Sequence, residues 1–493
     1  MILTCSQMKE AEDALFATGV SAESLMEVAG RGCAEAIQQF FPRSSEAILY
    51  LGKGHNAGDA LVVGRLLRKA GWNVSARLSG GREDLAALTR KKLSEFESTP
   101  NSAPAAADSL VLVDGLLGIG AKGAARGGLR VLADEMNEFR VTRGATCFAI
   151  DIPSGVDGDT GEAYEGAVIA DVSLAISHVK SGLLDDRAID HVGRLALIPL
   201  PGLTSEVGDS SRFTLHSDEL RSWLPTPPFS FHKSAAGRVG IIAGARGFTG
   251  AAILAATGAL RAGGGLVTLY VREEIYASAA AKAPAEVMVK SFGSLADISD
   301  DQLHAIAIGP GLTTKFAAEL VDFVQNDPRP MIVDADALNC VAQTPGALEN
   351  LPRNRLLTPH PGEMVRLFPE SSAIGNRLSI ARLFVEKVQT TLLYKGSRTI
   401  IEDPDPATPT AYNTTGQPGM ATGGIGDVLT GICAALAARG LSLYQSACLG
   451  SWLIGRAAEI QRWEFGQAPE GLTAGDVAQQ LPAAIASLRS GAW

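Results

Sequence analysis

Short, unbroken apolar runs alternate with glycine turns and helical patterns along this 493-residue chain, and they constrain its fold more than any other feature. In the first half the runs lie at residues 47–51, 74–78, 110–113, 147–150 and 172–176. In the second half they lie at residues 239–243, 266–271, 305–308, 331–333, 355–357 and 391–394. Strands that are apolar on both faces and separated by helices predict parallel sheets covered by helices on both sides. We therefore expect an α/β protein whose ligands bind at the strand ends.

A proline-rich stretch separates the two series of strands. Between about residues 198 and 231 the strand pattern dissolves, and prolines such as Pro199, Pro201, Pro227 and Pro228 surround a short polar segment. Stretches of this kind are typical of domain boundaries. We expect the boundary near residues 205–225, with one domain over residues 1–215 and another over 216–493.

The first forty residues predict two helices. Thr4 and Gln7 can form a capping box, and apolar residues then repeat at helical spacing from Met8 to Phe16. Ser21 precedes a second run with one apolar side.

The net charge of −10 disfavours a nucleic-acid partner, because nonspecific nucleic-acid binding needs clustered lysine and arginine. The densest basic runs are residues 90–92 and the set Arg65, Arg68 and Lys69, which we expect to be solvated helix faces. The six cysteines form no CxxC pair, so neither a zinc site nor a disulfide framework is expected. The longest apolar stretch, residues 440–455, is shorter than the roughly 20 residues of a membrane span. We expect a cytoplasmic protein without a membrane partner.

Glycines gather in loops at the ends of the predicted strands. Residues 423–427 read GGIGD and precede an apolar helix, so their backbone N–H groups and the helix N-terminus can hold a phosphate. Asp427 in the first turn can take a proton from an attacking hydroxyl, although a helix-capping role would explain it equally well. The loops 309–312, 358–363 and 395–399 also follow predicted strands, which suggests one shared pocket.

These segments closely resemble the ADP- or ATP-dependent NAD(P)H-hydrate dehydratases over residues 225–490. The first half is similar to the NAD(P)H-hydrate epimerase domain of the same bifunctional enzymes, through the motifs at residues 52–59, 114–123 and 151–158. The resemblance implies a Rossmann-like three-layer α/β/α domain followed by a ribokinase-like α/β domain. It also implies the repair of hydrated NADH and NADPH: the R and S forms are interconverted, and the S form is dehydrated at the expense of ADP.

The resemblance implies two sets of residues in the epimerase half. The hydrate NADHX or NADPHX would be bound by His55, Asn56, Ala57, Gly58, Asp59, Gly118, Ile119, Gly120, Ala121, Lys122, Gly123, Ala124 and Asp151. A potassium ion would lie near Asn56, Asp114 and Ser154, whose oxygens suit a hard cation. Without the resemblance, Asp114 and Asp151 would be strand-end capping residues. Epimerisation at C6 of the hydrated ring needs an acid and a base, and Asp151 is the candidate, with Lys180 as its partner or as a phosphate contact.

In the dehydratase half the resemblance places the hydrate and the adenine nucleotide on adjacent loops. The hydrate would contact Ala252, Gly311, His360 and Asp427, and ADP would contact Lys395, Gly396, Ser397, Arg398, Thr399 and Gly426. Asp427 would act as the base while the C6 hydroxyl is phosphorylated, after which phosphate leaves by elimination. Magnesium is expected with ADP. The family also suggests a homo-oligomer. Taken alone, His360 would be a structural loop histidine.

Two alternatives remain open. The second half could be a vitamin or sugar kinase of the same fold that releases a phosphorylated product. The first half could be a nucleotide-binding or oligomerisation module without catalysis, because His55 and Ala57 stand where the family usually has Asn and Gly. ADP and ATP are not distinguished by the residues, although bacterial members typically use ADP.

Overall fold

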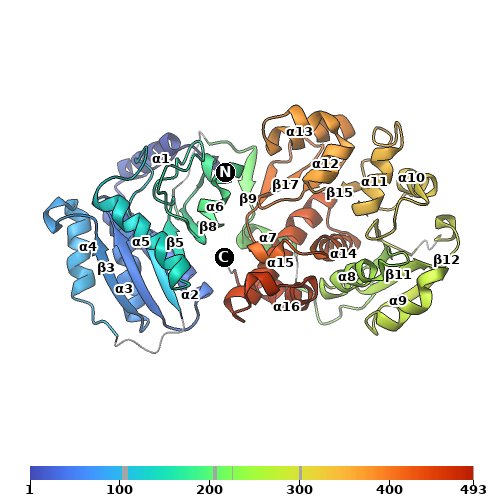
Figure 1. The fold of residues 1–493 in the computed structure, drawn as a ribbon, viewed down its shortest axis with the longest axis horizontal. Coiled ribbons are helices and arrows are strands. Elements are labelled where there is room, and N and C mark those ends of the chain that lie inside the picture. Colours follow the sequence, from blue (N-terminus) through green and yellow to red (C-terminus); the bar gives the residue numbers. More distant parts are fainter. Residues whose placement is uncertain (103–108, 204–207, 225, 299–301, 492–493) are drawn as a thin grey trace. The chain divides into compact units, whose positions relative to one another are not determined.

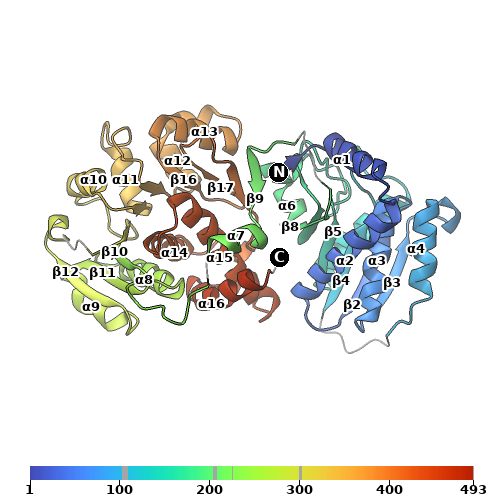
Figure 2. The ribbon, with the colours of Figure 1, turned by 180° about the vertical axis from the view of Figure 1, so that it is seen from behind.

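The computed structural model describes residues 1–102, 109–203, 208–224, 226–298 and 302–491. The chain divides into two compact units, Met1–Thr214 and Leu215–Ala492, which are coloured from blue to green and from green to red in Figures 1 and 2. Part of the predicted linker, residues 204–207 and 225, lies outside the described residues. Each unit contains a mostly parallel sheet with helices packed against it, so the predicted α/β class is confirmed.

The first unit is built on a six-stranded parallel sheet with the order β3-β2-β4-β5-β6-β8. The strands of this unit, including those outside the six-stranded sheet, are β1 (Ile2–Leu3), β2 (Glu46–Leu51), β3 (Asn73–Leu78), β4 (Leu110–Gly115), β5 (Thr146–Ile150), β6 (Val172–Ile176), β7 (Val179–Lys180), β8 (Arg194–Ile198) and β9 (Arg212–Thr214). Its helices are α1 (Cys5–Ala17), α2 (Ala22–Phe40), α3 (His55–Lys69), α4 (Ala87–Glu97), α5 (Gly128–Thr142) and α6 (Ile189–Val192). The short strand β1 pairs with β7 in a separate two-stranded sheet.

Alternate residues of the central strands pack against helices on opposite faces of this sheet. Leu112 and Cys147 belong to a buried cluster with Met136 of α5. Phe148, which follows Cys147 and therefore points to the other face, packs its ring 5.7 Å from that of Phe40 in α2. The predicted three-layer α/β/α arrangement is present, and Figures 1 and 2 show its two faces from opposite sides.

The second unit contains a larger sheet with the strand order β12-β11-β10-β13-β14-β15-β16-β17-β18. The strands are β10 (Arg238–Ile242), β11 (Leu266–Arg272), β12 (Met288–Phe292), β13 (Ala305–Ile308), β14 (Met331–Val333), β15 (Arg355–Leu357), β16 (Thr391–Tyr394), β17 (Thr399–Glu402) and β18 (Thr410–Asn413). The helices are α7 (Ser217–Trp223), α8 (Thr249–Arg261), α9 (Tyr276–Lys282), α10 (Ala317–Asn326), α11 (Ala335–Gln343), α12 (Pro361–Leu367), α13 (Arg377–Val388), α14 (Ile425–Ala438), α15 (Leu443–Trp463) and α16 (Ala474–Ser490). Strands β10 to β16 are parallel to their neighbours, whereas β17 and β18 are antiparallel. Among the described residues, no helix combines the length and the apolar character that a membrane crossing requires.

Two glycines allow α8 and α14 to approach each other closely. A Cβ atom at Gly431 of α14 would lie 1.9 Å from the carbonyl oxygen of Ala255, and one at Gly258 of α8 would lie 2.3 Å from that of Val428. Since no side chain fits at either position, the glycines fix the depth at which α14 packs beside the sheet. The N-terminus of α14 carries Asp427, so this packing positions the predicted base.

The structure adds elements that the apolar runs did not predict. Strands β8, β12, β17 and β18 lie outside the predicted set, and α3 begins at His55, inside the first glycine motif. The glycine motif at residues 52–59 is therefore partly helical, with Gly54 as the N-cap.

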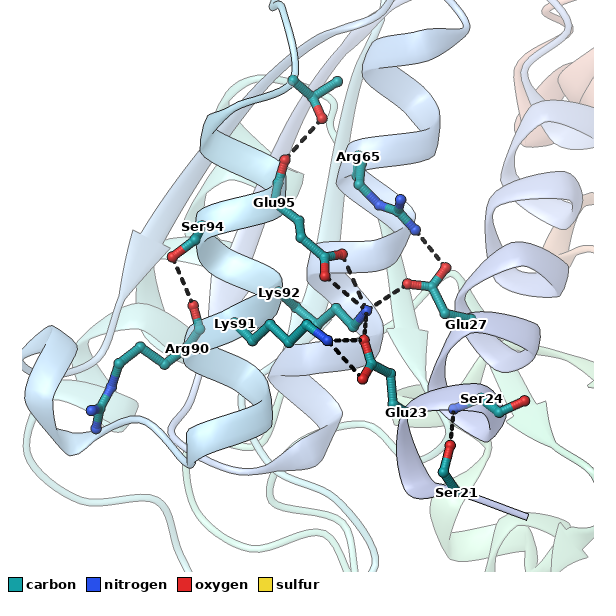
Figure 3. A network of polar contacts seen from close by, with 11 residues as sticks. Ser21, Glu23, Ser24, Glu27, Arg65, Arg90, Lys91, Lys92, Ser94 and Glu95 are labelled. Carbon is teal, nitrogen blue, oxygen red and sulfur yellow. Dashed lines mark hydrogen bonds and ion pairs between the residues drawn. The ribbon is translucent and has the colours of Figure 1, made fainter. Parts of the chain in front are cut away.

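The expectation that residues 90–92 form a solvated helix face is wrong for Lys92, whose side chain is 2% exposed. Its ammonium group lies 2.8 Å from Glu23, 2.7 Å from Glu27 and 3.1 Å from Glu95, as Figure 3 shows. These contacts join α2 and α4. Hydrogen bonds from Lys91 and Lys92 lower the pKa of Glu23 from 4.5 to about 2.

In the second basic set, Lys69 is exposed, whereas Arg65 and Arg68 contact other side chains. Arg65 lies 2.5 Å from Glu27, and the guanidinium of Arg68 lies 3.7 Å from the centre of the Phe96 ring.

Replacing Lys92 with methionine is expected to lower the free energy of unfolding by about 1–3 kcal/mol, because three carboxylates would lose their shared cation. Urea denaturation near neutral pH measures this loss. Lys91→Met is the matched control, since Lys91 is largely exposed, and its effect is expected to be much smaller. The lowered pKa of Glu23 means that the ion pairs contribute above pH 4.5 and are lost as the pH falls toward 2. Equal destabilisation by both variants would contradict this role of Lys92.

Candidate functional site

The first unit contains a cavity of about 790 Å³ at the carboxyl ends of its parallel strands. Loops after β2, β3, β4 and β5 form its walls, together with residues of α1 and α2. Of the residues predicted to bind the hydrate, it is lined by His55, Asn56, Asp59, Gly118, Ile119, Gly120, Ala121 and Asp151. Lys53 and Arg126, which were not predicted, add positive charge to the wall. A cavity of this size with polar loops suits a nucleotide-sized anionic ligand.

Other predicted residues do not line this cavity. Ala57 and Gly58 are buried in α3, so the methyl group of Ala57 does not project into the ligand space. Lys122, Gly123 and Ala124 continue the loop beyond the lining residues.

Asp151 has a conformation that is unusual outside glycine. Its φ angle is 67°, and a non-glycine residue in this region is typical of functional sites where the surroundings hold the backbone. Its carboxylate accepts hydrogen bonds from the backbone N–H of Ile176, at 3.0 Å, and from the Lys180 ammonium group. Lys180 is fully buried and also donates to the Ile176 carbonyl. Lys180 does not line the cavity, and this geometry favours a role in orienting Asp151 over a phosphate contact.

Three more carboxyl groups line the same cavity, those of Glu12, Asp59 and Asp84. Burial and the nearby charges of Asp151 and Glu12 hold the pKa of Asp59 well above its usual range. Burial also raises the pKa of Glu12, where Asp151 adds to the effect and Lys180 opposes it. Glu12 was missed by the sequence analysis. Its position on α1, on the cavity side between Met8 and Phe16, is a signal that helical spacing alone could have given.

The three predicted potassium ligands lie around one loop. The Asp114 carboxylate accepts hydrogen bonds from the Ser154 backbone N–H and hydroxyl, both at 2.7 Å, and from the Leu116 backbone N–H at 3.0 Å. Asn56 donates through Nδ2 to the Leu117 carbonyl at 2.6 Å, while the Ser154 hydroxyl accepts from the Leu117 N–H. Burial raises the pKa of Asp114 to about 6, although these hydrogen bonds oppose the shift. The hydrogen bonds show Asp114 fixing the loop, as a strand-end capping residue would.

In the second unit, Asp427 lies in the first turn of α14, just after Gly424, which has a φ angle of 91° and serves as the N-cap. The first N–H groups of the helix have no acceptor within it and can bind an anion. Burial raises the pKa of Asp427 to about 7, and the charge of Asp334 adds to the shift. A carboxyl group with this pKa can accept and return a proton near neutral pH.

Asp334, at the end of β14, connects the loops around Asp427. It is 1% exposed and accepts hydrogen bonds from the Lys395 ammonium at 2.8 Å and from the Thr430 hydroxyl at 2.7 Å. The Nζ atom of Lys395 also lies 3.8 Å from Glu363. A Cβ at Gly426 would lie 3.4 Å from the same Nζ atom, so Lys395 is adjacent to the first turn of α14. Although burial opposes it, the attraction of Asp334 and Glu363 raises the pKa of Lys395, which keeps its charge beside the start of α14. Asp334 and Thr430 were not predicted, because no local motif reveals a contact across 96 residues.

The Asp334 loop is held in a strained conformation. Ala335 has a φ angle of 49°, and Thr313, on the loop after β13, has one of 62°. The backbone N–H of Thr313 donates to Asp336 at 2.8 Å, which joins the two loops. A β-branched residue at positive φ is a rare conformation, and here the contact with Asp336 compensates for it.

The remaining predicted residues surround this centre in different ways. His360 is the N-cap of α12 and accepts hydrogen bonds from Gly362 and Glu363 through Nδ1, so it has the structural role as well as an exposed edge. The turn from Lys395 to Thr399 joins β16 to β17, and Arg377 donates to the carbonyls of Lys395 and Arg398. In this turn, Ser397 is exposed and Arg398 is buried. A Cβ at Gly396 would lie 2.5 Å from the Arg377 guanidinium, so a side chain there would displace that group from the turn.

Gly311 and Ala252 lie near the exposed residue Phe248. Gly311 has a φ angle of 63°, and a Cβ there would lie 2.8 Å from that of Phe248. The Ala252 side chain is fully buried in α8, so any ligand contact from it involves the backbone.

Two family models match the chain. Residues 239–482 match NAD(P)H-hydrate dehydratase, and residues 22–182 match the YjeF-related protein N-terminus. The bifunctional NAD(P)H-hydrate repair enzyme Nnr of Moorella thermoacetica is 35% identical over 94% of this chain and 92% of its own length. The enzyme of the same name from Escherichia coli is 35% identical over 93% of this chain and 88% of its own length.

Among solved structures, a ribokinase-like superfamily protein of Enterococcus faecalis resembles the chain with 25% sequence identity and a TM-score of 0.51. The match covers 58% of this chain and 99% of the other one.

Proposed function

The chain belongs to the family of bifunctional NAD(P)H-hydrate repair enzymes, and from this premise we propose how its two units divide the work. It is an enzyme with two activities, NAD(P)H-hydrate epimerase and NAD(P)H-hydrate dehydratase. The first unit, corresponding to the predicted domain 1–215, interconverts the R and S hydrates. The second unit, corresponding to residues 216–493, dehydrates the S hydrate with ADP as the phosphoryl donor.

The observation that carries the dehydratase proposal is Asp427, a carboxyl group with a pKa of about 7 at the glycine-rich start of α14. The oxygen of the C6 hydroxyl attacks the terminal phosphorus of ADP, and Asp427 takes the proton of that hydroxyl. AMP is the leaving group. The N–H groups at the start of α14 and the Lys395 ammonium stabilise the charge on the transferring phosphoryl group. Phosphate is a better leaving group than hydroxide, so elimination from C6 then restores NADH or NADPH.

Magnesium is proposed as a partner of ADP that enters with the nucleotide. Mg²⁺ usually keeps several waters and binds mainly through phosphates in such sites. Among the described residues, no group of three or more His, Cys, Asp or Glu side chains is arranged to hold a metal ion, which agrees with a phosphate-borne ion. The remaining nucleotide contacts come from Gly396, Ser397, Arg398, Thr399 and Gly426.

In the epimerase half, Asp151 is proposed as the base and Lys180 as the residue that orients it. Potassium fits the oxygens of Asn56, Asp114 and Ser154, since Asn56 turns its Nδ2 toward two carbonyls and its Oδ1 accepts no hydrogen bond from a described residue. When bound, the ion would add positive charge beside the loop that starts at Gly118.

The function is tested by incubating the chain with chemically prepared NADHX, a mixture of R and S forms, and ADP. Complete recovery of the absorbance of NADH is expected when both halves work. Asp151→Asn is expected to stop recovery after the S form is consumed, because R is no longer converted to S faster than in buffer. Recovery by Asp151→Asn at the wild-type extent would favour a non-catalytic first unit. Turnover of a vitamin alcohol without recovery of NADH would favour a kinase.

A further inference from the structure

The cavity of the first unit receives carboxyl groups from two different walls. Asp151 follows the carboxyl end of β5, whereas Glu12 comes from α1, and both line the cavity. Asp59, from α3, lies in the lining as well. With the exposed Asp84, four acidic residues line the space where the hydrate is proposed to bind, and Asp151, Glu12 and Asp59 are the three that are not exposed.

These acids differ in their partners. Asp151 is paired with the buried ammonium of Lys180 and accepts a backbone hydrogen bond. The side chains of Glu12 and Asp59 form no hydrogen bond or ion pair with any residue that the structure describes. The charges that reach Glu12 are those of Asp151 and Lys180, together with Asp13 on its own helix.

The difference in partners separates the protonation states of the acids. Two unpaired carboxylates cannot both remain charged in a partly buried space beside a third. Asp151 has the Lys180 ammonium group as its partner, whereas burial raises the pKa values of Glu12 and Asp59. The cavity thus contains a carboxylate that can accept a proton and a carboxylic acid that can donate one, which is the pairing that acid–base catalysis requires.

We propose that Glu12 is a catalytic residue of the epimerase half and donates the proton with which the C6 hydroxyl of the hydrate leaves as water. The proposal rests on the epimerase function proposed above and names a further residue for it. Asp151 is the proton acceptor.

The step balances in atoms and charge. Glu12 gives its proton to the C6 oxygen, the C6–O bond breaks, and the lone pair of the adjacent ring nitrogen forms a double bond to C6. Water is released and Glu12 becomes a carboxylate. Water then adds to either face of the planar C6 carbon, and Asp151 takes the proton that it loses. Exchange of protons with water returns both carboxyl groups to their starting states.

The test compares Glu12→Gln with Glu10→Gln, a matched control at an exposed position of the same helix. Interconversion of purified R and S NADHX is measured without ADP, and the rate in buffer is subtracted. Glu12→Gln is expected to lower the rate by about 100-fold, because general acid catalysis is removed. Glu10→Gln is expected to leave it unchanged. Dehydration of the S form should be unaffected in both variants.

The pH dependence distinguishes a proton donor from a structural residue. A proton donor must be protonated, so the wild-type rate is expected to fall as the pH rises through the raised pKa of Glu12. Glu12→Asp keeps a carboxyl group and is expected to keep this alkaline fall with a partly reduced rate, whereas Glu12→Gln should lose it.

Three results would overturn the proposal: a wild-type rate in Glu12→Gln, an unchanged alkaline fall in that variant, or equal losses in Glu12→Asp and Glu12→Gln. A wild-type protein that dehydrates S but does not interconvert the hydrates above the buffer rate would contradict the proposed epimerase function itself.

Discussion

Replacing Asp427 with asparagine is expected to lower the rate of ADP-dependent dehydration of the S hydrate by about 10³-fold, because the C6 hydroxyl loses its proton acceptor. Asparagine keeps the size of the side chain and the start of α14, so binding of ADP should change little. The rate of R-to-S interconversion in the same protein is the internal control and is expected to remain at the wild-type value. Asp322→Asn, at an exposed position of α10, is the matched control in the second unit.

The pH dependence follows from the raised pKa of Asp427. The carboxyl group must be ionised to accept a proton, so kcat/KM for dehydration in the wild type is expected to reach a plateau above about pH 7 and to fall at lower pH. The small residual activity of Asp427→Asn should lack this acidic fall. A variant that keeps the wild-type profile would assign the titration to another group and contradict the role of Asp427.

Asp427→Asn should also be more stable than the wild type. The folded-state pKa of about 7 lies above the usual value of 3.8, so ionising Asp427 destabilises the folded protein. This destabilisation is complete above pH 7 and absent below pH 3.8. Asp427→Asn is therefore expected to raise the free energy of unfolding at pH 8 by about 1–3 kcal/mol. A variant that is less active and more stable is typical of a residue held at a functional site against its intrinsic preference.

The sequence predicted the central strands of both sheets but not their edges. Runs such as residues 110–113 and 305–308 are apolar on both faces because helices cover both sides of the sheet. Strand β12, with Lys290 and Ser291, is largely exposed, and β17 and β18 are a short antiparallel extension, so none of these has the same signature. Lys92 illustrates a second limit, because a lysine in a basic run looks solvated until the acids of another helix are placed around it.

The site residues divide in a similar way. Glycine motifs pointed to Asp427, the loop after Gly118 and the turn at Lys395, because a glycine-rich loop lets the backbone approach a ligand closely. Glu12 has only its helical spacing as a local signal, and Asp334 has no glycine motif of this kind. Asp334 acquires its environment from contacts with Lys395 and Thr430, which are 61 and 96 residues away. Contacts between residues so far apart in the sequence depend on the fold, and helical spacing shows only the face of the helix on which Glu12 lies.

Replacing Asp334 with asparagine is expected to lower the dehydration rate by about 10²-fold or more, although Asp334 need not touch either substrate. In the wild type, the Lys395 ammonium group lies 2.8 Å from Asp334. The positive charge of Lys395 therefore only partly offsets burial and the charge of Asp334, which raise the pKa of Asp427. Without the Asp334 carboxylate, Lys395 turns toward Asp427. The Asp427 pKa should then fall well below 7, which makes Asp427 a weaker base and removes Lys395 from the phosphoryl group.

Variants at Thr430 separate this electrostatic role from simple packing. Thr430→Val removes the hydroxyl that donates to Asp334 at 2.7 Å and is expected to lower the rate by about 10-fold, whereas Thr430→Ser keeps the hydroxyl and should retain most of the activity. The decisive measurement is the pH profile of kcat/KM for dehydration. In Asp334→Asn its acidic fall should move to lower pH, since a negative charge that raised the pKa of Asp427 has been removed. An acidic fall that stays near pH 7 in an otherwise slow Asp334→Asn enzyme would reduce Asp334 to a packing residue, because loss of packing alone does not change the proton affinity of Asp427.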